Sequence, residues 1–187
     1  MLRPVYPLIT ERLVLRPFTD DDFDDVYAYH SRPEVARYLY WEARDREQVR
    51  TALERMTTQT TLTEEGQLLL LAVYWPEAGA VVGQVNLEWL SQENRQGETG
   101  FVFNPDYHGK GLAREAAEVM LRLGFEELGL HRVIGRCDPR NEPSWRLMER
   151  LGMRREAHFV QNEIFKGEWG DEYVYAMLAE EWRTRRR

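Results

Sequence analysis

Apolar residues recur along the chain with two different periods, and each period predicts a different kind of element. The segment QLLLLAVYW, residues 67–75, is a continuous apolar run, which predicts a strand covered on both faces. Residues 80–90 alternate apolar and polar positions, as a strand does when one of its faces meets the core. That alternation places five residues on one face: Val81, Gly83, Val85, Leu87 and Trp89. Further strands are expected at 8–18, 97–104, 131–138 and 155–178, the last as two strands.

Helical spacing explains most of the remaining chain. Thr19 can cap a helix whose first turn holds three aspartates, and a second helix is expected from Arg46 to about Gln59. The strongest helical run follows Gly111, and residues 141–152 predict a shorter helix. One stripe of the strong helix is apolar or small: Ala113, Ala117, Met120, Leu121, Gly124 and Leu128. The order β-α-α-β-β-β-α-β-α-β-β predicts an α/β protein built on a mixed sheet.

Length and composition bound the class of protein. A chain of 187 residues suits one domain, 1–187, with a core over about 8–180 and a frayed tail at 183–187. No apolar run reaches the roughly 20 residues of a membrane span, and the N-terminus lacks a signal-peptide pattern. Cys137 is the only cysteine, which excludes intrachain disulfides and favours a reducing, cytoplasmic compartment. The net charge of −7 argues against nucleic-acid binding, so an anionic ligand would need a local positive site.

Such a local site is suggested by the turn that precedes the strong helix. Gly109 and Gly111 let the backbone approach a ligand closely, and the helix start offers unpaired N–H groups. Together they indicate an anion site, most naturally for phosphate, although an ordinary strand-to-helix turn remains the alternative. The turn is not a P-loop, because Lys110 precedes Gly111 and no Ser or Thr follows. Nor is it a dinucleotide fingerprint, because Arg114 stands where the third glycine belongs.

The turn and three further blocks resemble the GNAT N-acetyltransferase superfamily. The segment HGKGLA, residues 108–113, is similar to the (Gln/Arg)-x-x-Gly-x-(Gly/Ala) acyl-CoA loop, with His108 in place of the usual first residue. The blocks ITERLVLRPFTDDDF, GETGFVFNPDYHGKGLAREA, DPRNEPSWRLMERLGM and FKGEWGDEYVYAML follow in the order of the branch that contains ribosomal-protein N-terminal acetyltransferases. The resemblance therefore covers nearly the whole chain.

The resemblance implies a GNAT-like, mostly antiparallel seven-stranded sheet whose fourth and fifth strands splay apart. Pantetheine would pair with the fourth strand in the gap, and the pyrophosphate would sit on backbone N–H groups of the turn. Candidates for the 3′-phosphate are Lys110, Arg114, Arg146 and Arg150, although each could be a solvated surface charge. The expected acetyl-CoA-binding residues are Phe101, Val102, Phe103, His108, Gly109, Lys110, Gly111, Leu112, Ala113, Arg114, Asn141, Ser144 and Arg146.

Acetyl transfer to an amine needs a proton acceptor, and this branch often carries a glutamate at the start of the fourth strand. Glu98 has that place and shares a face with Gly100 and Val102, although it could be a structural or surface carboxylate. Glu88 is the second candidate. The oxyanion donor would be a backbone N–H near Val102 or Phe103.

The proton donor for the leaving thiolate is less obvious. Many family members carry a tyrosine where this chain has Met148, which cannot donate a proton. Ser144 is the replacement expected here, with helix capping, a pantetheine contact or protonation by solvent as alternatives. Asn141 would bond the pantetheine amide or cap the helix. Cys137 lies in a strand without an obvious base, so we expect a packed thiol.

The resemblance thus implies an acetyl-CoA-dependent N-acetyltransferase whose acceptor is a primary amine, either a small molecule or a protein N-terminus. The alternative is a non-catalytic acyl-CoA-binding sensor on the same scaffold. We expect a monomer or homodimer, without a metal ion, a nucleic-acid partner or a membrane partner.

Overall fold

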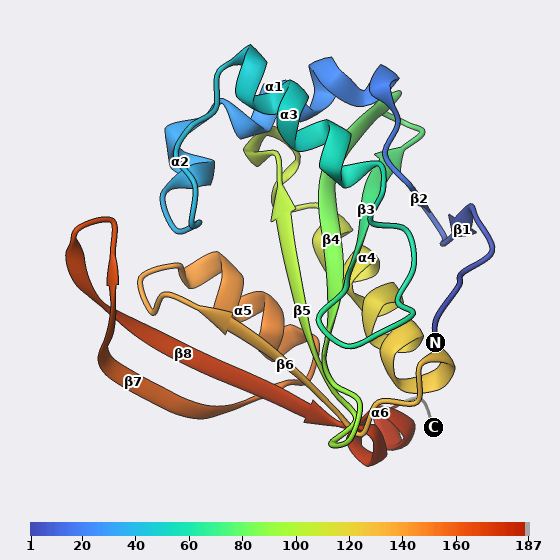
Figure 1. The fold of residues 1–187 in the computed structure, drawn as a ribbon, viewed down its shortest axis with the longest axis vertical. Coiled ribbons are helices and arrows are strands. Elements are labelled where there is room, and N and C mark those ends of the chain that lie inside the picture. Colours follow the sequence, from blue (N-terminus) through green and yellow to red (C-terminus); the bar gives the residue numbers. More distant parts are fainter. Residues whose placement is uncertain (186–187) are drawn as a thin grey trace.

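The protein, described by a computed structural model over residues 1–185, is built on one mixed sheet. Eight strands follow the spatial order β1-β2-β3-β4-β5-β6-β8-β7 (Figure 1). The strands are β1 Leu8–Ile9, β2 Val14–Arg16, β3 Leu68–Trp75, β4 Ala80–Ser91, β5 Gln96–Phe103, β6 Arg132–Cys137, β7 Arg154–Phe165 and β8 Glu168–Leu178. The helices are α1 Phe23–His30, α2 Pro33–Ala36, α3 Arg46–Met56, α4 Leu112–Arg122, α5 Glu142–Arg150 and α6 Ala179–Arg185. None of these helices is long and apolar enough to cross a membrane.

The sheet opens between β5 and β6. These two strands run parallel and pair only where Gln96–Glu98 lie beside Arg132–Ile134. Beyond that point the strands diverge, while β4 stays paired with β5 as far as Phe103 (Figure 1). β1 and β2 together take the place of the first of the seven expected strands, so β5 is the fourth and β6 is the fifth. The expected splay between the fourth and fifth strands is therefore confirmed.

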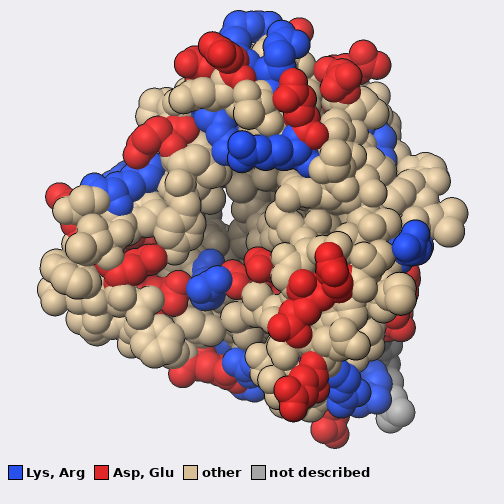
Figure 2. All heavy atoms as spheres, in the orientation of Figure 1, with Lys and Arg blue, Asp and Glu red and all other residues tan. Residues whose placement is uncertain are grey.

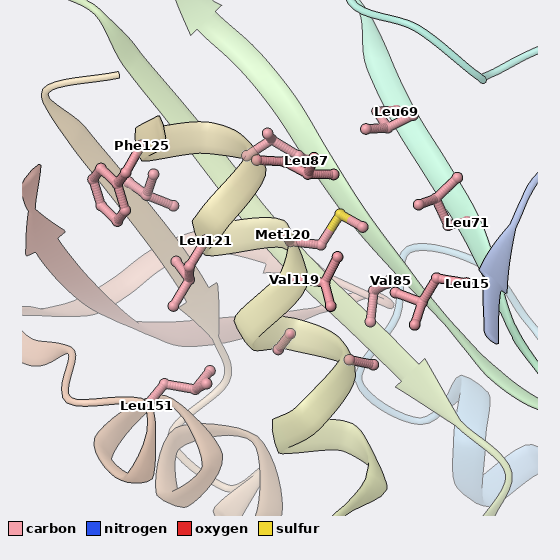
Figure 3. Packing of buried hydrophobic residues seen from close by; sticks show 14 of the residues in the cluster. Leu15, Leu69, Leu71, Val85, Leu87, Val119, Met120, Leu121, Phe125 and Leu151 are labelled. Carbon is pink, nitrogen blue, oxygen red and sulfur yellow. The ribbon is translucent and has the colours of Figure 1, made fainter. Parts of the chain in front are cut away.

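Helices cover both faces of the sheet centre. Along β3, Leu69 and Leu71 pack with α4, whereas Leu70 and Ala72 pack with α1 and α3. Figure 3 shows the first of these layers, with Met120 of α4 lying against β4. The continuous apolar run therefore forms a strand that is covered on both faces, as its pattern predicts.

Two expectations about the strands need correction. The first expected strand is a hairpin of two short strands, β1 and β2, because the Thr10 hydroxyl bonds both the N–H and the C=O of Leu13 and turns the chain. The alternation in β4 breaks at a bulge, where the register to β3 shifts at Val81. Val81 consequently packs in the α1–α3 layer, while its neighbour Val82 packs with Val85 in the α4 layer.

The expectation of a frayed tail is also wrong for residues 183–185. They belong to α6, whose Trp182 is buried and stacks on Phe125. The Arg185 guanidinium bonds the carbonyl oxygens of Leu151 and Arg150 at the end of α5. The sequence of α6 is too short to show the helical repeat of apolar residues from which a helix could have been predicted. Arg186 and Arg187 lie outside the described residues.

Candidate active site

A hollow runs into the molecule near its centre, beside the opening between β5 and β6 (Figure 2). Lys and Arg side chains gather along its upper edge in this view, and Asp and Glu side chains along its lower edge. One side of the hollow is closed by the β7–β8 hairpin. The Lys166 ammonium donates to the carbonyl oxygens of Ala36 (2.9 Å) and Trp41 (3.2 Å). The Tyr40 hydroxyl donates to Glu163 across the same contact (2.6 Å).

The glycine turn takes the conformation that its sequence predicts. Gly109 and Gly111 have φ values of 78° and 79°, in the left-handed region that favours glycine, and Gly111 is the N-cap of α4. Glu115 is the first residue of α4 whose N–H finds a backbone acceptor, the carbonyl of Gly111 (3.2 Å). Within residues 1–185, the six backbone N–H groups from Gly109 to Arg114 donate no hydrogen bond to the backbone or to a side chain. The turn therefore offers a concave group of free donors at a helix start.

Arg12, which the sequence patterns did not single out, holds this turn. Its Nη1 donates to the carbonyl oxygen of Lys110 (2.9 Å), and its Nε donates to the Glu115 carboxylate (2.8 Å). The N–H of Arg12 and the hydroxyl of Thr10 also bond that carboxylate. These contacts keep the pKa of Glu115 below its usual value in spite of its partial burial. The β1–β2 hairpin is thus tied to the start of α4.

The cationic side chains proposed for the 3′-phosphate fall into two groups. Arg114 pairs with Glu118 (3.1 Å), and Arg146 pairs with Glu142 (2.5 Å), both across one helical turn. Lys110 and Arg150 form no ion pair with the described residues. The Lys110 ammonium instead lies 5.7 Å from the centre of the Trp75 ring. Lys110, next to the free N–H groups, is therefore the cation most available to an incoming phosphate.

Glu98 lies at the point where β5 and β6 part, and Arg136 of β6 holds it. The guanidinium Nη2 is 2.8 Å from Oε2 of Glu98, and Nε bonds both carboxylate oxygens at 3.0 and 3.1 Å. Glu88 lies opposite Glu98 in the β4–β5 register. Glu172 of β8 approaches the same guanidinium at 3.9 Å. Two carboxylates, Glu98 and Glu172, therefore share one arginine, and Glu88 lies beside them.

Burial and crowding make two of these carboxylates easier to protonate. Burial raises the pKa of Glu88, the negative charge of Glu98 raises it further, and Arg136 opposes the rise. Burial also raises the pKa of Glu172, with Arg136 again opposing. Glu88 has no hydrogen-bond or ion-pair partner for its carboxylate within residues 1–185. Arg136 was missed by sequence reasoning, although a charge inside an otherwise apolar strand was a signal that could have found it.

The start of α5 brings the remaining candidates together. Burial raises the pKa of the Cys137 thiol to about 12, and the nearby Ser144 hydroxyl opposes the rise. This thiol is therefore protonated at neutral pH and is no nucleophile, as a packed cysteine should be. Asn141 occupies the N-cap position but does not cap the helix with its side chain. Met148 is buried against Gly135, so its place is in the core.

The fold and the site together define an acetyltransferase of the GNAT class. Residues 12–154 match the acetyltransferase (GNAT) domain family, to which this chain therefore belongs as an N-acetyltransferase. The uncharacterized N-acetyltransferase YnaD of Bacillus subtilis (strain 168) is 35% identical over 175 residues, covering 94% of this chain and 98% of that protein. A crystal structure of a GNAT-family acetyltransferase from Bacillus anthracis superposes with a TM-score of 0.83 at 36% identity, covering 94% and 100% of the two chains.

Relatives named for a substrate include two different kinds of acceptor. The [ribosomal protein uS5]-alanine N-acetyltransferase of Escherichia coli (strain K12) is 24% identical over 184 residues, 96% of this chain and 94% of that protein. The spermidine N(1)-acetyltransferase of the same strain is 29% identical over 91 residues, 49% of each chain. The resemblance to the branch with ribosomal-protein acetyltransferases is confirmed.

Proposed function

We propose that this protein transfers the acetyl group of acetyl-CoA directly to a primary amine, either of a small molecule or of a protein N-terminus. GNAT acetyltransferases use acetyl-CoA, and a thioester bound here would supply an activated acyl carbon. The observation that carries the proposal is the set of six free N–H groups from Gly109 to Arg114, beside a sheet opened between β5 and β6. That combination suits a pyrophosphate followed by an extended chain.

Residues on both sides of the opening fit the rest of such a ligand. Beyond Glu98, the edge of β5 that faces β6 has no strand partner within residues 1–185, so the backbone groups of Phe101, Val102 and Phe103 that point to this edge are available to pantetheine. The side chain of Asn141 has no hydrogen-bond partner within residues 1–185 and is free to bond a pantetheine amide. His108, Lys110 and Arg146 would then lie near phosphate groups, and the residues from Leu112 to Arg114 would contribute their N–H groups.

For the chemistry, we assign proton acceptance to the carboxylates of Glu98 and Glu88, which lie opposite each other in the β4–β5 register. Glu98 would take the proton of the amine directly or through water, and Arg136 would keep its carboxylate in place. A backbone N–H near Val102 would donate to the developing oxyanion. Ser144 is the proposed proton donor to the leaving thiolate. Its hydroxyl lies near the thiol of Cys137, and that thiol is itself protonated at neutral pH.

A pair of substitutions tests the binding half of this proposal. Gly111→Trp should remove measurable CoA binding in calorimetry, because a bulky side chain would cover the free N–H groups and strain a φ of 79°. Gly129→Trp is the matched control, since Gly129 also has a positive φ and open space around it, and lies in an exposed turn beyond the opposite end of α4. Circular dichroism should show both variants folded. Equal CoA affinities in the two variants would refute the loop assignment.

The catalytic half is tested by turnover. Glu98→Gln should lower kcat for release of free CoA thiol, over a panel of amines and peptides, with little change in CoA affinity. The variant keeps the shape of the side chain but cannot accept a proton at neutral pH. If kcat and its pH dependence match those of the parent, Glu98 is not the base. CoA binding without turnover on any amine would instead favour a sensor.

A further inference from the structure

A second polar site is a cavity on the side of the sheet that α1 and α3 cover. It has a volume of about 440 Å³ and lies between α3, the loop after α2, and strands β3 and β4. The residues that decide its chemistry are His30, Trp41, Arg44, Arg55 and Gln84. Gln84 pairs with Val102 in the β4–β5 register, so this wall of the cavity lies next to the strand proposed to hold pantetheine.

A chain of hydrogen bonds fixes which atoms face this cavity as donors. Arg44 Nη1 bonds His30 Nδ1 at 3.0 Å, and His30 Nε2 bonds Gln84 Oε1 at 3.0 Å. Burial lowers the pKa of His30 to about 4, so its ring is neutral and carries one proton. Because Arg44 can only donate, that proton is on Nε2, which donates to Gln84 Oε1. The Tyr29 hydroxyl donates to the same oxygen (3.1 Å), which leaves Gln84 Nε2 as a free donor.

Arg44 is a half-buried cation without an anion. Its guanidinium lies 4.3 Å from the centre of the Trp41 ring and, within residues 1–185, pairs with no carboxylate. Arg55, an exposed residue that also lines the cavity, forms no ion pair with the described residues, and burial together with the charge of Arg55 lowers the pKa of Arg44. The one acidic side chain in the lining, Glu47, is exposed at the rim and unpaired.

Charges that are partly buried are normally paired, because desolvation without a partner is costly. Here two arginines and an amide N–H₂ converge on one cavity in a chain whose net charge is −7. The Arg44 guanidinium is held by Trp41 and His30, and its Nε and Nη2 atoms bond no residue within 1–185, so it is well suited to bind carboxylate or phosphate oxygens.

We propose that this cavity binds a carboxylate or phosphate group of the amine acceptor, and that Arg44 is the main residue that recognises it. The proposal rests on the proposed function and narrows its substrate class to amines that also carry an oxyanion. Gln84, Asn86 and Glu88 share one face of β4, and the first and last are about 13 Å apart at roughly 3.3 Å per residue. An amino acid or short peptide would span from the arginines toward the carboxylates. A polyamine has no group for the arginines.

Matched acceptor pairs test this inference in the full-length enzyme with saturating acetyl-CoA. The pairs are a dipeptide with a free C-terminus against its C-terminal amide, and phosphoethanolamine against ethanolamine. We expect the oxyanion form of at least one pair to have a kcat/KM about tenfold higher or more, as the loss of a charge-assisted hydrogen bond implies. The two pairs distinguish a carboxylate from a phosphate. Spermidine turned over faster than every anionic amine would overturn the proposal.

Arg44→Gln supplies the residue-level test, with Arg50→Gln as the matched control. Arg50 lies on the same side of the molecule, on α3, but stacks on Phe23 outside the cavity. Arg44→Gln should erase the preference for the oxyanion through KM for the acceptor, leaving KM for acetyl-CoA unchanged. Arg50→Gln should keep the preference. If both variants keep the preference for the oxyanion, Arg44 does not recognise the oxyanion of the acceptor.

A binding measurement separates this inference from the proposed function. Inorganic phosphate is titrated into the CoA-saturated enzyme, so that the glycine turn is already filled. Calorimetry should detect phosphate binding in the parent and the Arg50→Gln variant, and a loss of about tenfold or more in Arg44→Gln and Arg55→Gln. Thermal unfolding without phosphate should show Arg44→Gln folded, because the loss of its contacts with His30 and Trp41 is offset in part by removal of a half-buried, unpaired charge. Equal phosphate binding in all four proteins refutes the site while leaving acetyl transfer intact.

Discussion

His30 should make the protein measurably less stable as the pH falls from 7 to 5. Its side chain is buried, and burial lowers its pKa from 6.5 to about 4. Above pH 6.5 the ring is neutral in both the folded and the unfolded chain, so folding carries no proton penalty. As the pH falls below 6.5, the unfolded chain binds a proton that the folded protein still excludes. A tenfold difference in proton affinity is worth about 1.4 kcal/mol, so the loss reaches about 2 kcal/mol at pH 5.

The assay is urea unfolding at pH 7 and at pH 5, in the parent and in His30→Gln. The glutamine does not titrate in this range, so the variant should lose about 2 kcal/mol less than the parent between the two pH values. It will start from a lower stability at pH 7 because ring contacts with Tyr29 and Trp41 are lost. Only the difference between the two pH values is diagnostic. His131→Gln, at an exposed histidine, should behave as the parent. Equal losses in the parent and His30→Gln would show that the buried ring does not control acid stability.

Three further substitutions test the parts of the site that hold other parts in place. Arg12→Ala removes the donor to the carbonyl of Lys110, so KM for acetyl-CoA should rise about fivefold, as one net hydrogen bond implies, while kcat stays constant; an unchanged KM would mean that the turn holds itself. Arg136→Gln removes the cation that opposes the raised pKa of Glu88, so the acidic limb of the kcat profile should move to higher pH; a profile that stays in place excludes Glu88 from proton transfer. Gly83→Ala would bring a Cβ within 2.6 Å of a β5 carbonyl oxygen, and urea unfolding should show a loss of about 1–3 kcal/mol; wild-type stability would show that β5 can move.

Local patterns were sufficient for the parts of the structure that depend on neighbours in sequence. The glycine turn is one example, because Gly109 and Gly111 need their positive φ regardless of the surroundings. The run in β3 is another, since a short run with four successive leucines is typical of a strand covered on both faces. The splay between β5 and β6 came from family resemblance, and no feature of either strand alone indicates where their pairing stops.

The features that local patterns missed depend on contacts between distant residues. The bulge at Val81 is a mismatch between two strands, so an alternating pattern in one of them cannot show it. Arg12 and Arg136 act on Glu115 and Glu98, which lie 103 and 38 residues away along the chain. Arg44 looks like any loop arginine in the sequence. Its unpaired state becomes visible only in the fold, where His30 contacts it and no carboxylate of residues 1–185 pairs with it.

The two proposed anion sites should respond differently to salt, because they hold charge in different ways. At the glycine turn the contacts are mainly uncharged N–H groups, and the net charge of −7 repels a strongly anionic ligand over a longer range. At 0.1 M salt the screening length is about 10 Å, which weakens that repulsion and affects short hydrogen bonds little. In the second cavity the attraction comes from Arg44 and Arg55, and salt anions compete for it. Between low and physiological salt, KM for an anionic acceptor should therefore rise more steeply than KM for acetyl-CoA. The opposite order would mean that side-chain charges such as Lys110 dominate CoA binding and that the arginine cavity is not where the acceptor's oxyanion lies.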